Sequence, residues 1–237
     1  MLRMKILFTS LLMTIAGTVF STASGDGGWK FDEAPVGQVL VLGSRTECDG
    51  TLVGADVVMT VAHCIIPVGE TEAVDASEVR FSMADSDGFV RVFEVEDVAY
   101  PEGFEHMEVP TRKQISQDVA LLKLTEFASE VSDDISLVDP SASYVALLPA
   151  RETDVFEGEP CEVTYEENGV MVLECARDRG ASGGPVYSMI GGSRKLVGLI
   201  SADGKTSEGS VVFAVNPMGV LDRLEWVSEK RARITDQ

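Results

Sequence analysis

Apolar residues in this chain come in short runs that are separated by turn-forming residues. Runs of this length that are rich in Val, Ile and Thr and bounded by Gly, Asp or Pro are typical of β-strands. In the first half of the chain the pattern predicts strands at 36–42, 50–54, 57–61, 79–83, 89–98 and 119–124. The segments 100–116 and 126–143 are mainly polar, and we expect a surface loop and a linker there.

The second half of the chain also has short apolar runs that predict strands, but its end predicts a helix. Strands are predicted at 144–148, 185–190, 195–201 and 211–215, and residues 162–174 form a predicted hairpin around Asn168-Gly169, a favoured two-residue turn. Asn216-Pro217 combines an N-cap residue with a proline at the first helical position, so a helix is expected to start there. The expected fold class is all-β with a C-terminal α-helix.

Composition and charge narrow the function classes. The chain has 237 residues, a hydrophobic content of 45% and a formal net charge of −20. The hydrophobic content favours a globular core. The negative charge argues against a nucleic-acid partner, whose phosphates need Lys and Arg, and against an anionic membrane surface.

The first 23 residues resemble an export signal. Arg3 and Lys5 precede an apolar stretch from Ile6 to Phe20, and small residues lead to Ala23. The apolar stretch is shorter than the roughly 20 residues of a membrane-spanning helix, so we expect cleavage near Ala23 and no stable membrane anchor. The protein is then secreted or periplasmic. The expected organisation is a signal peptide at 1–23, an N-terminal domain at 24–135 and a C-terminal domain at 136–237.

Four cysteines are present, and none belongs to a C-x-x-C pair. Export and an even count favour two disulfides, for which three connectivities exist. We predict Cys48–Cys64 and Cys161–Cys175, because each pair brackets a predicted hairpin. In the loop-entropy account, a bridge that closes about 15 residues contributes roughly 3 kcal/mol.

Three residues in three local contexts suggest nucleophilic catalysis. Ser182 lies in Gly180-Ala181-Ser182-Gly183-Gly184-Pro185, where glycines allow a tight turn that exposes the hydroxyl. His63 directly follows an apolar strand, and Asp118 opens another. Each alone is compatible with a purely structural role. Together they supply a nucleophile, a general base and a residue that orients the base.

The motifs around these residues resemble the trypsin/chymotrypsin-like serine proteases. The similarity covers Gly50 to Gly54, Thr60-Val61-Ala62-His63-Cys64, the strand that starts at Asp118 and the glycine-rich serine turn, in the order of that family. It is closest to the compact bacterial, glutamyl-endopeptidase-like branch. The resemblance implies two antiparallel six-stranded β-barrels with the site between them, and a monomer that cleaves protein or peptide substrates without cofactor or metal. It also implies an oxyanion hole formed by the Gly180 and Ser182 N–H groups. The Cys48–Cys64 disulfide would match the family's bridge beside the histidine. Ser201 resembles the serine of the family that supports the aspartate and borders the substrate cleft.

The chain departs from the family at several positions. Ala176 occupies the position where trypsins place the acid that binds Lys or Arg, and no histidine follows His106, although glutamate-specific relatives use one in the second half. The residue before the nucleophile is Ala181 rather than Asp, and no matching activation site is present, so we expect no zymogen switch of that kind. The sequence therefore leaves the primary specificity open. His106 is expected on a surface loop without a catalytic role.

Other functions fit the sequence less well. The serine turn also matches the G-x-S-x-G elbow of α/β-hydrolases, but that fold needs a histidine after the serine, and none is present. A metalloprotease is disfavoured because the chain has only two histidines and no H-E-x-x-H. A catalytically silent, protease-like binding or scaffold protein remains the alternative to a serine endopeptidase.

Overall fold

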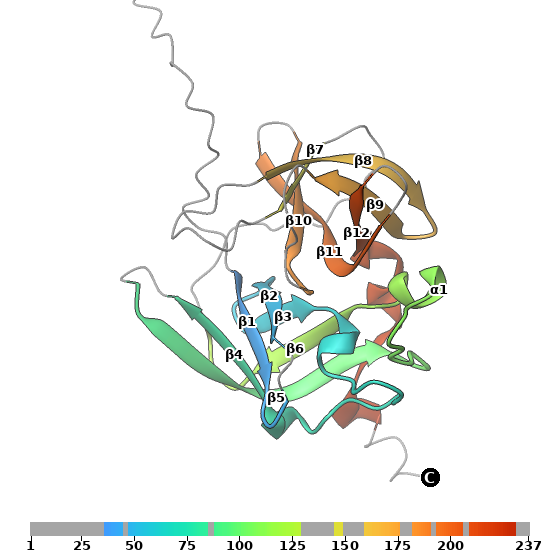
Figure 1. The fold of residues 1–237 in the computed structure, drawn as a ribbon. Coiled ribbons are helices and arrows are strands. Elements are labelled where there is room, and N and C mark those ends of the chain that lie inside the picture. The colour runs from blue at the N-terminus through green and yellow to red at the C-terminus, as the bar shows by residue number, and fades with distance from the viewer. Residues whose placement is uncertain are drawn as a thin grey trace, which may run out of the picture.

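Figure 1 shows a computed structural model of the chain. It describes residues 36–44, 47–84, 88–128, 145–148, 159–175, 182–190, 193–205 and 209–230. The predicted signal peptide, most of the predicted linker at 126–143 and the predicted cleft residue Ala176 lie outside the described residues.

The N-terminal half is a curled antiparallel sheet. Its strands are β1 (Val36–Val41), β2 (Glu47–Leu52), β3 (Val57–Thr60), β4 (Val79–Ala84), β5 (Val90–Pro101), β6 (Ala120–Leu124) and the late β13 (Leu224–Trp226). Their order is β13-β5-β4-β1-β2-β3-β6, and β6 also pairs with β5. The sheet therefore bends back on itself around fully buried side chains such as Leu52, Phe81, Phe93 and Leu122.

The C-terminal half is a closed six-stranded barrel. It contains β7 (Val145–Leu148), β8 (Glu159–Glu167), β9 (Val170–Cys175), β10 (Pro185–Ile190), β11 (Ser193–Lys205) and β12 (Ser210–Val215). The β8–β9 hairpin turns at Asn168 (φ 54°) and Gly169 (φ 77°), so the predicted turn is confirmed. Cys161 is disulfide-bonded, and the strand register places it opposite Cys175, its predicted partner.

The two halves share an apolar contact. In Figure 1 the barrel of β7 to β12 lies directly above the sheet of β1 to β6. The main hydrophobic cluster of the N-terminal sheet includes Tyr187, Leu196, Leu199 and Val215 from the barrel. The predicted all-β, chymotrypsin-like fold is thus confirmed, with one closed barrel and one barrel-like sheet of seven strands rather than six.

The structure corrects the prediction in two segments. Residues 100–116 are not one loop, because β5 extends to Pro101 and α1 (Arg112–Ile115) follows, capped reciprocally by Thr111 and Gln114. The helix expected from Asn216 is two 3-10 turns, η3 (Pro217–Gly219) and η4 (Leu221–Arg223), followed by β13 and then helical residues at 227–230. Asn216 does cap, because its side chain accepts from the Met218 N–H.

Across the described residues, helices are too short or too polar to cross a bilayer.

Candidate active site

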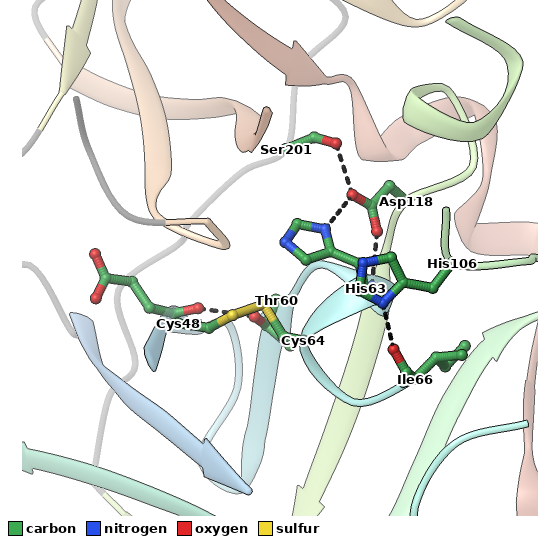
Figure 2. Close-up of a disulfide and its surroundings, with 9 residues drawn as sticks. Cys48, Thr60, His63, Cys64, Ile66, His106, Asp118 and Ser201 are labelled. Carbon is green, nitrogen blue, oxygen red and sulfur yellow. Dashed lines mark hydrogen bonds and ion pairs between the residues drawn. A yellow bond between two sulfur atoms is a disulfide. The ribbon is translucent and has the colours of Figure 1, made fainter. Parts of the chain in front are cut away.

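His63 lies just after the end of a buried strand. It lies in η1 (Ala62–Cys64), a single 3-10 turn that follows β3, and its neighbour Ala62 is fully buried. On its other side Cys64 is bonded to Cys48 of β2, as predicted. The disulfide therefore ties the turn that carries His63 to the adjacent strand (Figure 2).

Asp118 lies next to the imidazole, between α1 and β6 in the chain, and is only 3% exposed. Its Oδ2 is 2.7 Å from His63 Nδ1, and its Oδ1 accepts from the His63 backbone N–H at 2.9 Å. Ser201 Oγ donates to the same Oδ2 at 2.6 Å (Figure 2). Three hydrogen bonds thus compensate for the burial of this carboxylate.

These contacts determine the tautomer of His63. A carboxylate only accepts hydrogen bonds, so Nδ1 must carry a proton, and Nε2 of the neutral ring is then an acceptor. The His63 side chain is 17% exposed, so part of the ring is accessible to solvent. An imidazole with this tautomer is suited to remove a proton from a hydroxyl group.

Ser182 is held between the two halves of the molecule. Its carbonyl accepts from the Asp49 N–H of β2 at 2.7 Å. The next two residues bond to β11 of the barrel, with Gly183 N–H donating to Ile200 O and Ile200 N–H donating to Gly184 O, each at 2.8 Å. The turn therefore depends on the relative position of both halves.

The cavity that separates the two halves brings these side chains together. It has a volume of about 240 Å³ and is lined by His63, Asp118, Ser182 and Ser201, with residues 202–203 and parts of the segment 104–114. In the described part of the chain, no hydrogen bond joins Ser182 Oγ to His63. Such bonds are often long in unliganded enzymes and shorten when substrate binds. We refer to this cavity as the cleft.

Gly180, the other predicted oxyanion-hole residue, and Ala181 lie outside the described residues. The Ser182 backbone is described, and Gly183 follows it with φ +83°, a conformation that favours glycine.

His106 is not the remote surface residue that the sequence suggested. It lines the cleft, and its ring centroid is 5.3 Å from that of His63. The segment 104–106 is drawn inward because the Gly69 N–H donates to His106 O and the His106 N–H donates to Glu70 O. These bonds join two irregular loops, so no periodicity in the sequence signals them.

Cys48, His63 and Cys64 place possible metal ligands within 4.8 Å of one another. Both sulfur atoms belong to the disulfide and so cannot act as thiolate ligands. The arrangement is a structural bridge beside an imidazole rather than a metal centre.

Comparison with known proteins supports the fold and gives the family. One solved structure similar to the chain is the secreted serine protease VesC from Vibrio cholerae, with a TM-score of 0.57 and 18% sequence identity. The alignment covers 81% of this chain and 46% of VesC, so the chain spans less than half of that protein, and the likeness concerns the fold. No curated protein matches the chain.

Comparison with protein-family models identifies the family as well as the fold. The trypsin family model matches residues 31–177, which include His63 and Asp118 and end before Ser182. This match covers more than half of the chain, and the chain therefore belongs to the trypsin family.

Proposed function

We propose that this protein is an exported serine endopeptidase that uses Ser182 as nucleophile, His63 as general base and Asp118 to orient the base. The observation that carries the proposal is the hydrogen bond from His63 Nδ1 to the buried Asp118, in a cleft that Ser182 also lines. Membership of the trypsin family suggests peptidase activity and protein substrates. Export is supported by the disulfide and by the signal-like N-terminus.

The proposed reaction proceeds through an acyl-enzyme. Ser182 Oγ attacks the peptide carbonyl carbon while His63 Nε2 takes the hydroxyl proton, and Asp118 stabilises the resulting imidazolium. His63 then gives this proton to the amine that leaves as the C–N bond breaks. Water attacks the ester in the same way and regenerates Ser182. The nucleophile, the base and the orienting carboxylate in this scheme are side chains of the protein, and water is the second substrate.

The oxyanion hole and the substrate preference belong to the proposal as well. Backbone N–H groups of Gly180 and Ser182 are the proposed donors to the developing oxyanion, an interaction that contributes about 3 kcal/mol. We also propose membership of the compact bacterial branch of the family, together with a monomeric state. Glutamate specificity has no support, because the chain has no histidine after His106.

A second candidate is a protease-like binding protein without activity. This candidate fits the fold and the family match equally well, because the matched segment ends before Ser182. A latent site of this kind would bind peptides in the cleft and leave them intact. The two functions differ in whether Ser182 is chemically activated.

Labelling with a fluorophosphonate distinguishes them, because this reagent reacts with an activated serine. We expect the mature protein to be labelled at Ser182, and we expect no labelling of Ser182→Ala and strongly reduced labelling of His63→Ala. Intact mass and peptide mapping identify the modified residue. Unlabelled protein with native circular dichroism and both disulfides formed would contradict the peptidase and favour the binding protein.

A further inference from the structure

His106 forms a fixed part of the cleft wall next to His63. The planes of the two rings are inclined by 46°, with 5.3 Å between centroids. Both backbone groups of His106 are hydrogen-bonded to the loop at 69–70, and its side chain is half-buried. The imidazole is thus positioned from a second loop and is not a mobile surface group.

One hydrogen bond determines which ring nitrogen of His106 is available. Its Nδ1 lies 2.6 Å from Ile66 O (Figure 2). A carbonyl oxygen can only accept, so Nδ1 carries the proton and Nε2 of the neutral ring is an acceptor. None of the described residues bonds to Nε2. The cleft therefore contains an uncommitted acceptor close to the proposed base.

Carboxylates, which can only accept hydrogen bonds when ionised, lie around His106. Glu105, Glu108 and Asp203 also line the cleft, and all three are exposed. Gln114 is the one amide in the described lining, and one of its two N–H donors is bonded to Glu105 O. Near His106, the described side chains that can receive a substrate thus present mainly acceptors.

We propose that His106 is a specificity-determining residue of the proposed peptidase. Its Nε2 accepts a hydrogen bond from a substrate side chain and so favours residues with a donor, lysine above all, over apolar residues of the same shape. Consecutive residues of an extended peptide are about 3.5 Å apart, so a ring 5.3 Å from His63 contacts a residue next to the scissile bond or one further away. The inference rests on the proposed function, since it requires cleavage at Ser182.

The test compares peptides that differ only in lysine or norleucine, placed in turn at each position around the cleaved bond. Norleucine keeps the four side-chain carbons of lysine and lacks only the terminal amino group, so it has no donor. We expect the wild-type protein to prefer lysine by about tenfold in kcat/KM at one of these positions. His106→Asn keeps a donor for Ile66 O but has no atom at the place of Nε2, and it should bring the ratio close to one. His106→Gln places a polar atom near the position of Nε2 and should restore part of the preference.

Glu102→Gln is the matched control, since Glu102 is exposed in the same segment and does not line the cleft. It should leave the lysine to norleucine ratio at the wild-type value. Fluorophosphonate labelling of every variant separates the two proposals. If the wild-type protein is labelled and His106→Asn retains the full lysine preference, the role of His106 is overturned alone. If the folded wild-type protein is not labelled, the proposed function is overturned, and this inference with it.

Discussion

Replacing Asp118 by asparagine is expected to lower kcat by roughly 10⁴-fold while the chain stays folded. The reason lies in the two hydrogen bonds that Asp118 accepts from His63. The backbone N–H is a fixed donor to Oδ1, so the amide of asparagine must place its oxygen there. Its NH₂ group then faces His63 Nδ1, at the position where Oδ2 lies in the native protein. Nδ1 becomes an acceptor, the proton moves to Nε2, and the ring can no longer act as a base.

Two measurements test this explanation. Peptide cleavage gives kcat, and ¹⁵N NMR of labelled histidine shows directly which nitrogen of His63 is protonated. Asp222→Asn is a suitable control, because Asp222 is an exposed carboxylate in η4 that does not line the cleft. It should leave kcat and the NMR signals of His63 unchanged. An Asp118→Asn protein that keeps a tenth or more of the native kcat would contradict the orienting role of Asp118.

The parts of the fold that the sequence predicted are those with local causes. Residues 185–190 form a strand with the predicted bounds, and Asn168-Gly169 turns the hairpin because both residues adopt positive φ angles easily. The pair Cys48–Cys64 could be predicted because it brackets one such hairpin. Each of these features depends on residues that are close in sequence.

The features that were missed depend on distant contacts. Leu221, Leu224 and Val227 have helical spacing, yet 224–226 pairs with the end of β5, and this pairing overrides the local preference. His106 is positioned at the cleft by backbone bonds to residues 69 and 70 and by a side-chain bond to Ile66 O. The helix α1, in contrast, had a visible signal, since Thr111 and Gln114 have the spacing of a capping box.

Gly183→Ala, which changes the glycine that follows the nucleophile, is expected to lower both the stability of the protein and the reactivity of Ser182. Gly183 has φ +83°, and a Cβ atom there would lie 2.1 Å from Asp49 O and 2.4 Å from Thr60 Oγ1. Asp49 O is a backbone atom that also accepts from Thr60 Oγ1, so neither neighbour can move away freely. The serine turn would have to withdraw from β2, which breaks the 2.7 Å bond between Asp49 N–H and Ser182 O.

We therefore expect Gly183→Ala to lose about 3 to 5 kcal/mol in free energy of unfolding. A shift of Ser182 by about 1 Å should lower its fluorophosphonate labelling rate by about 10²-fold or more. Thermal unfolding and labelling kinetics measure the two effects separately.

Gly43→Ala is the matched control, because Gly43 has φ +81° and no atom within 4 Å of the added Cβ. It carries the same backbone strain without the collision, so its cost should be about 1 kcal/mol, with labelling unchanged. Equal losses in both variants would mean that backbone strain alone acts at Gly183. A larger loss confined to Gly183→Ala would mean that close contact with β2 and β3 holds the nucleophile in place, so that the site exists only while the two halves of the molecule are joined.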